Sequence, residues 1–272
     1  MFNYIKLGWN GTLNQRFLLV ALFVYHFLWG FILYRYVSSV VIPIMHRFPD
    51  KALAKSTVQL FFAESQFRII KTDLSHPYLW LLLGLLLGRM ILTPLLNAGI
   101  FFSLHHTRYN AGYRFLKGIK SLGGTFFFYY LIRLALTSVP LFWIVPAAKN
   151  IVQNSYAYDE IIPQLLLYLA ICLVYGYMVH IAFVYAQLAK TTENSPFPSI
   201  RFVCRHLLSI GGVSIFLLVL TGLVTIVFVT ASLVWAGLVA LIVYQLYRFI
   251  HVFCKIWTLS SHYQLWISQA RM

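Results

Sequence analysis

The chain contains very few acidic residues. Aspartate and glutamate together number 6 among 272 residues, and charged residues of both signs make up only 10% of the chain. Because soluble domains carry about 25% charged residues, this composition excludes an ordinary soluble fold. None of the carboxylates falls inside a predicted apolar span. Their absence there excludes an intramembrane aspartate pair and the membrane carboxylates that proton-coupled transporters usually employ.

Cysteine and the sequence signatures of known catalysts are also scarce. The three cysteines (Cys172, Cys204 and Cys254) are odd in number and have no CxxC spacing, so we expect neither a disulfide framework nor a zinc site. The sequence contains no HExxH, no GxSxG, no P-loop and no dinucleotide-binding glycine pattern. We therefore expect a protein that is not an enzyme and holds no metal or cofactor.

Apolar residues, by contrast, make up 61% of the chain. Apolar runs of the roughly 20 residues that cross a bilayer recur along its whole length. We predict an all-α fold, a single transmembrane domain over residues 1–272 with six membrane-spanning helices in three hairpins. The predicted spans are 17–42, 78–104, 125–146, 161–188, 209–230 and 238–259. Residues 45–77 are predicted to form an amphipathic segment on the outer side, with a helix that starts after Asp50.

The net charge of +15 is distributed unevenly between the two sides of the predicted bundle. Lysine and arginine are more numerous on one side of the bundle than on the other. The side richer in these cations comprises an interfacial helix predicted at residues 1–15, the loops 105–121 and 189–208, and the C-terminal tail. Five of the six acids lie on that opposite side. The positive-inside rule therefore places both termini in the cytoplasm. Because most cations flank spans, the expected partner is an anionic lipid surface and not nucleic acid.

Three arginines, Arg89, Arg133 and Arg248, fall inside predicted spans near mid-depth. A guanidinium stays charged in any protein environment, and at the bilayer centre it costs about 2.5–3.5 kcal/mol on insertion scales. No acidic partner is available in the same layer. These arginines therefore need another anion or a set of oriented dipoles.

Polar residues accompany these arginines at helical spacing, which predicts polar stripes facing the interior of the bundle. The stripes are Arg89, Thr93 and Asn97; Tyr129, Arg133 and Thr137; and Tyr244, Arg248, His251 and Lys255. If they converge, they form a cationic cavity suited to a lipid phosphate or another oxyanion. The predicted ligand contacts are Arg89, Asn97, Arg133, Tyr244, Arg248, His251 and Lys255.

Other roles for the same residues stay open. Arg133 and Arg248 could snorkel to the head groups, Arg89 could bond to carbonyls freed by Pro94, and tyrosines could stack on the cations. Gly84 and Gly88 form a GxxxG pattern that fits a close contact with another helix of the same chain, which we favour, or a dimer face. The histidines within spans, His26, His180 and His251, admit a b-type haem as a remote alternative. Their different depths favour local hydrogen bonds instead.

Two stretches resemble a group of bacterial six-span membrane proteins that includes the membrane domain attached to glycerophosphodiester phosphodiesterases. One is Leu96-Asn-Ala-Gly-Ile-Phe-Phe with the basic run to Gly124, and the other is Tyr185-Ala-Gln-Leu with the run Pro196–Arg205. The resemblance implies a non-catalytic role in the bacterial cytoplasmic membrane. The layout is also similar to ABC exporter permeases, in which loops 105–121 and 189–208 would contact a soluble ATPase. Loop 105–121 lacks the acidic residue that such permeases often carry.

Overall fold

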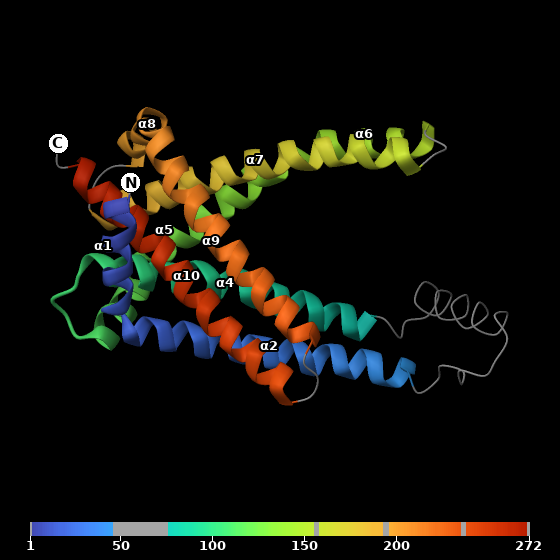
Figure 1. The fold of residues 1–272 in the computed structure, drawn as a ribbon, viewed down its shortest axis with the longest axis horizontal. Helices are drawn as coiled ribbons and strands as arrows, with labels where there is room; N and C mark the ends of the chain where they lie inside the picture. Colours follow the sequence, from blue (N-terminus) through green and yellow to red (C-terminus); the bar gives the residue numbers. More distant parts are fainter. Residues whose placement is uncertain (1, 46–75, 155–157, 193–195, 235–237, 271–272) are drawn as a thin grey trace. The chain divides into compact units, whose positions relative to one another are not determined.

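The computed structural model describes residues 2–45, 76–154, 158–192, 196–234 and 238–270 (Figure 1). Over these residues the protein is all-helical and contains no strand. The helices are α1 (Phe2–Leu13), α2 (Arg16–Met45), α4 (His76–His105), α5 (Ala111–Ser138), α6 (Leu141–Asn154), α7 (Tyr158–Thr191), α8 (Pro196–Arg205), α9 (Leu207–Val234) and α10 (Leu238–Ala270). The predicted all-α class is therefore confirmed.

Five helical segments among the described residues are long and apolar enough to cross a membrane, as in a multi-pass membrane protein. They are Arg16–Ser39, His76–His105, Ala111–Ile151, Pro163–Thr191 and Leu207–Ser232. Helix α10, which contains the predicted sixth span, is not among these five. It carries several polar residues, including Gln245, Arg248 and Lys255, within the segment predicted to cross.

The chain divides into two compact units. Unit 1 comprises residues 1–20 and 94–272, and unit 2 comprises residues 21–93. In unit 1, α10 packs against α1, α7 and α9, and α7 packs against α5, α6 and α8. In unit 2, the Tyr36 hydroxyl donates a 3.1 Å hydrogen bond to the Tyr78 carbonyl and so links α2 to α4.

Two prolines within predicted spans, Pro94 and Pro140, have different effects on their helices. Helix α4 continues through Pro94 without a break. The predicted span 125–146, however, is two helices, because α5 ends at Ser138 and α6 starts at Leu141. Pro140 has no backbone N–H to donate to the Leu136 carbonyl, as a residue at that position in a continuous helix would. That carbonyl instead accepts bonds from the Val139 N–H (3.2 Å) and from the Tyr175 hydroxyl (3.2 Å).

The segments described as loops or as a tail contain helices, as expected for the basic stretches that could form interfacial helices before spans 125–146 and 209–230. Most of the basic loop 105–121 belongs to α5, which starts at Ala111, and the predicted tail continues α10 to Ala270. Lysine and arginine favour helices nearly as much as alanine, so a basic stretch does not by itself end a helix. Helix α8 lies within the predicted loop 189–208. The predicted helix after Asp50 lies outside the described residues.

Glycines make the close helix contacts of unit 1, although not the pair predicted to do so. A Cβ added at Gly99 of α4 would lie 2.6 Å from the Phe115 ring of α5. One added at Gly8 of α1 would overlap Ser261 of α10. Gly84 and Gly88, in contrast, have no described atom within 4 Å of an added Cβ. Within unit 2, therefore, no described helix makes this close contact, and the GxxxG contact stays a prediction.

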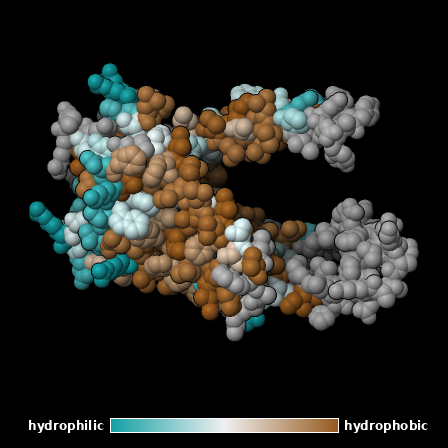
Figure 2. Space-filling model, viewed as in Figure 1, coloured by the Kyte–Doolittle hydropathy of each residue, from teal (hydrophilic) through white to brown (hydrophobic). Residues whose placement is uncertain are grey.

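Apolar side chains remain exposed along the long helices of unit 1. On α9 these exposed residues include Ile215, Leu218, Val219, Leu223, Ile226 and Val227. Figure 2 shows the hydrophobic colour along α7 and α9. A soluble protein rarely exposes so continuous an apolar surface, whereas lipid tails would cover it in a membrane.

Candidate functional site

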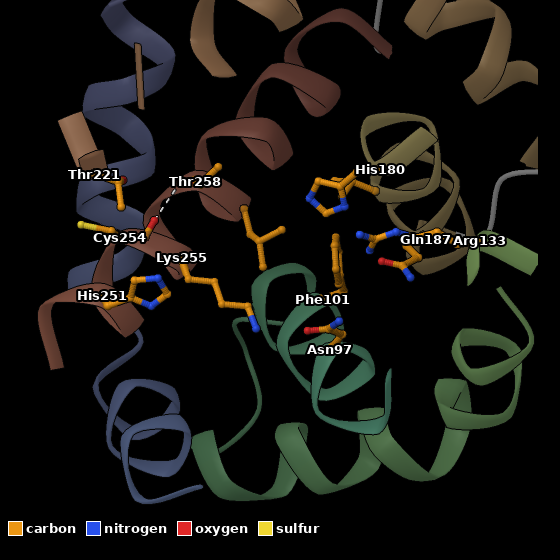
Figure 3. A pocket seen from close by; sticks show the side chains of 12 residues that line it. Asn97, Phe101, Arg133, His180, Gln187, Thr221, His251, Cys254, Lys255 and Thr258 are labelled. Atoms are coloured by element: carbon orange, nitrogen blue, oxygen red, sulfur yellow. Dashed lines mark hydrogen bonds between the residues drawn. The ribbon is translucent and has the colours of Figure 1, made fainter. Parts of the chain in front are cut away.

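A partly open cavity of about 260 Å³ lies inside unit 1 and is lined by residues of five helices (Figure 3). The lining residues are Asn97 and Phe101 of α4, Arg133 of α5, His180, Val184 and Gln187 of α7, Thr221 of α9, and His251, Cys254, Lys255, Thr258 and Leu259 of α10. The cavity lies where α7 and α10 come together with the C-terminal part of α4. Long helices therefore fix the positions of its polar groups.

Two basic side chains face this cavity from different helices. Arg133 comes from α5, and Lys255 comes from α10. Figure 3 shows Lys255 reaching toward Asn97, with the Arg133 guanidinium on the other side of Phe101. None of the twelve lining residues is acidic. The cavity therefore combines positive charge with apolar walls, an environment in which an anion is attracted more strongly than in water.

Neutral side chains supply further hydrogen-bond donors at the cavity wall. Asn97 and Gln187 each bring a side-chain amide with two N–H groups. The two threonines are different, because their hydroxyl protons are already used. Thr221 donates to the Leu217 carbonyl (2.7 Å), and Thr258 donates to the Cys254 carbonyl (2.9 Å). Each threonine hydroxyl is thus left as an acceptor, whereas the amides remain donors.

His180 has a buried ring nitrogen, Nδ1, for which the described residues provide no hydrogen-bond partner. Leaving a buried polar atom without a partner costs about 1–3 kcal/mol. Such an atom at a cavity wall points to a water or a ligand as the missing partner. In Figure 3 the imidazole lies next to the Arg133 guanidinium and faces the space beside Phe101.

The structure brings together four of the seven predicted ligand contacts. Asn97, Arg133, His251 and Lys255 all line the cavity. They come from α4, α5 and α10, the three helices whose polar stripes had to converge to form a cavity. Arg133 also lies one turn before Thr137, whose hydroxyl donates to the Arg133 carbonyl. The Thr137 hydroxyl proton is therefore committed to its own helix.

The other three predicted contacts do not line this cavity. The Arg248 guanidinium donates a 2.8 Å hydrogen bond to the Tyr244 hydroxyl and lies 4.7 Å from the centre of the Tyr244 ring. The alternative in which a tyrosine ring stacks on a cation therefore applies to Tyr244 and Arg248. Arg89 is exposed and belongs to unit 2, where its carbonyl accepts a bond from Thr93 (2.7 Å).

Among the lining residues that were not predicted as ligand contacts are two polar residues of α7, His180 and Gln187. His180 was noted only as one of three histidines within spans, and Gln187 only within a resemblance motif. Both lie on α7, seven residues apart in the sequence, a separation that places them on one helical face. His180 and His251 line the same cavity, whereas His26 belongs to unit 2.

A second buried polar cluster joins the start of the chain to α4 and α5. The Arg114 guanidinium donates a 2.6 Å hydrogen bond to Gln15 Oε1, which also accepts one from the Ser103 hydroxyl (3.1 Å). The Gln15 amide donates in turn to the Ser103 carbonyl (3.2 Å). Arg114 is only 6% exposed. It is therefore not part of the exposed basic surface that the sequence analysis assigned to a soluble partner.

Among the described residues, no group of three or more histidine, cysteine, aspartate or glutamate side chains is placed to hold a metal ion. Comparison with protein families, curated proteins and solved structures gave no match to this chain. Function is therefore argued from the cavity itself.

Proposed function

We propose that this chain is a non-enzymatic, six-span protein of the bacterial cytoplasmic membrane that binds a phosphate-bearing anion in the cavity of unit 1. Both termini lie in the cytoplasm in this proposal, and α10 supplies the sixth span. The observation that carries the proposal is the pair of cations, Arg133 and Lys255, facing one cavity without an acidic lining residue.

Two positive charges in a partly apolar cavity carry an energetic cost. Arg133 keeps its charge at any pH, and burial in apolar surroundings without compensation is unfavourable. A phosphate oxyanion would offset this cost, because a guanidinium can donate two parallel hydrogen bonds to it. Lys255 would contribute a second charge from the opposite wall. The side-chain amides of Asn97 and Gln187 would orient the anion.

A binding role agrees better with these residues than catalysis. The lining residues include no carboxylate that could act as a base or nucleophile, and the two threonine hydroxyls donate to backbone carbonyls. The anion could be the head group of an anionic membrane lipid or a free phosphate-bearing molecule. The chemistry of recognition is the same for both sources.

Native mass spectrometry of the detergent-solubilised protein tests the proposal directly. The probes are inorganic phosphate, phosphatidylglycerol and, as a zwitterionic control, phosphatidylcholine. We expect wild type to retain the anionic probes, and the double variant Arg133→Gln/Lys255→Gln to lose that retention. Equal retention by both proteins would refute the proposal.

Arg248→Gln is the matched control for this experiment. It removes one positive charge from α10, as Lys255→Gln does, but from a residue that does not line the cavity. We expect Arg248→Gln to retain the anionic probes as wild type does. If it lost them to the same degree, net charge and not the cavity would explain the binding.

A transport role with a soluble ATPase is the alternative from the sequence. Arg114, in the segment expected to contact that partner, is buried against Gln15. Purification in mild detergent distinguishes the two functions. We expect no stoichiometric ATPase to accompany the protein, and its presence would favour the transport assembly.

A further inference from the structure

We propose that the start of α5 carries a docking surface for the head groups of anionic membrane lipids, separate from the cavity. This surface, which we call the aromatic–lysine face, consists of Tyr109, just before α5, and Tyr113, Leu116, Lys117 and Lys120 on its first turns. None of these five residues lines the cavity. Lipid binding at this face therefore does not depend on the proposed anion site.

The first turns of α5 have a buried side and an exposed side. Arg114, Phe115 and Gly118 are buried. Gly118 lies against α4, since a Cβ added there would come within 2.5 Å of the Phe102 side chain. The four helical residues of the aromatic–lysine face recur at steps of three and four, which places them together on the opposite side, and all are exposed. One side thus packs within unit 1, and the other faces the surroundings of the chain.

Two tyrosine rings hold the Lys117 side chain in position on this face. Lys117 Nζ lies 4.9 Å from the centre of the Tyr109 ring and 5.7 Å from the centre of the Tyr113 ring. The two rings meet edge to face, with their centres 5.9 Å apart. A lysine side chain loses rotamer freedom when it binds a ligand, and part of that loss has already occurred here. The rings attract the ammonium but leave its charge in place, so it remains available to an anion.

The charge of this region complements an anionic surface. The sequence contains no aspartate or glutamate in residues 1–49, 74–158 or 194–272, ranges that include α1, α4, α5 and α10. Arg108, which precedes Tyr109, adds a third exposed basic side chain to Lys117 and Lys120. Each lysine or arginine close to an anionic lipid surface favours binding to it. Several such side chains without a neighbouring carboxylate therefore favour an anionic occupant.

The aromatic and apolar residues of the face identify that occupant as a bilayer surface. Tyr109, Tyr113 and Leu116 are 46%, 57% and 65% exposed. Tyrosine is enriched at membrane–water interfaces, because its ring suits the apolar side and its hydroxyl the polar side. The face also lies at the start of the segment Ala111–Ile151, which is long and apolar enough to cross a membrane. A segment that enters hydrocarbon brings its first turns to the level of the head groups.

Figure 2 agrees with this placement. The hydrophilic colour gathers at the end of unit 1 where Figure 1 places α1 and the turn between α4 and α5, and hydrophobic colour follows along the helices. The aromatic–lysine face thus lies where a polar end of the molecule meets its apolar surface.

Photocrosslinking of the full chain in nanodiscs tests the face directly. The discs consist of phosphatidylcholine with a trace of phosphatidylglycerol that carries a photoreactive head group, and a phosphatidylcholine probe with the same reactive group is the lipid control. After illumination and proteolysis, mass spectrometry gives the crosslink yield within residues 109–120. We expect the yield from phosphatidylglycerol to be at least about fivefold higher, the factor expected for one lysine at an anionic lipid surface.

Variants of exposed residues locate this preference. Lys117→Gln/Lys120→Gln should bring the two probes close to equal yield, whereas Lys117→Arg/Lys120→Arg keeps the charge and should keep the preference. Lys149→Gln is the matched control, because it removes an exposed lysine from α6, outside the face. It should leave the yield ratio unchanged. Tyr109→Leu/Tyr113→Leu keeps both lysines but removes the rings, and it should lower the ratio by about half. An unchanged ratio there would overturn the role of the rings.

The outcomes separate this face from the cavity. A preference that persists in Arg133→Gln/Lys255→Gln but is lost in Lys117→Gln/Lys120→Gln supports a second, independent lipid site. Equal yields from both probes in wild type would overturn the face and leave the proposed function intact. A preference lost only in the cavity variant would assign the lipid contact to the cavity and also overturn the face.

Discussion

His262 connects three helices of unit 1, and it should make the stability of the protein depend on pH. Its ring nitrogens lie 3.1 Å from the Tyr185 hydroxyl of α7 and 3.2 Å from the Ser214 hydroxyl of α9. All three side chains are buried, and His262 is only 5% exposed. The ring therefore links α10 to both neighbours in a site that water does not reach.

Burial lowers the pKa of His262 from 6.5 to about 4 in the folded protein, because a protonated ring would lose its hydration there. The unfolded state, with a pKa near 6.5, binds a proton more readily as the pH falls. The stabilising contribution is therefore complete above about pH 6.5 and is lost as the pH falls toward 4. At roughly 1.4 kcal/mol per pH unit, the loss amounts to about 3 kcal/mol.

The assay is the unfolding midpoint in mild detergent, followed by tryptophan fluorescence at pH 7.5, 5.5 and 4.5. His262→Gln is the matched variant, because glutamine keeps a donor and an acceptor but does not titrate in this range. We expect wild type to lose more stability than His262→Gln on acidification. Other groups titrate in both proteins, so their effects cancel in the comparison. Parallel pH profiles would refute the assignment to His262.

Three further predictions concern packing, buried charge and the haem alternative. Gly8→Ala should lower the unfolding temperature because the new Cβ meets the backbone of Ser261 (2.8 Å), whereas Gly11→Ala meets a side-chain hydroxyl that can rotate away, so it should cost little. Gln15→Leu should destabilise the protein by about 3 kcal/mol, measured by denaturant unfolding, because it leaves the buried Arg114 charge without its 2.6 Å partner. Purified protein should show no Soret absorbance, and a Soret band would favour the haem alternative.

The apolar runs were sufficient to predict the helices and most of the spans, because hydrocarbon requires long, uninterrupted helices. Charge was less informative about helix ends. The basic stretch after His105 was expected to be a loop or a helix in the interface plane, yet Arg114 lies on the long helix α5 and is buried. Charged side chains indicate which segments avoid lipid. The end of a helix depends instead on whether the backbone N–H and C=O groups keep their hydrogen-bond partners. Pro140, which removes one such partner, was the better signal for the break between α5 and α6.

The polar stripe of α10 shows what helical periodicity can and cannot predict. The spacing placed Tyr244, Arg248, His251 and Lys255 on one face. His251 and Lys255 line the cavity, but Arg248 pairs with Tyr244 one turn before His251. Periodicity gives direction around the helix axis and not how far along the axis a cavity extends. The length of the cavity along the axis depends on the neighbouring helices, and the polar stripe of one helix does not predict where these lie.

Glycine patterns and buried polar residues were predicted least well. The spacing of Gly84 and Gly88 indicates that another helix could approach, but not that one does. Gly8 makes such a contact although α1 was expected to lie in the interface. His262 was also missed, because it lies beyond the predicted sixth span in a segment expected to be a tail. The small neighbours Ser260 and Ser261 were the available signal, since small residues allow helices to pack closely.

The proposed sixth span and the proposed anion site depend on the same property of α10. Among the described residues α10 is not one of the helices that qualify as spans, and His251 and Lys255 place polar groups within its predicted span. Polar side chains such as these would be unfavourable on a helix surrounded by lipid, but α10 packs against α1, α7 and α9. Its polar face then lines a cavity and not the hydrocarbon, so it can cross the membrane provided that its charge is compensated.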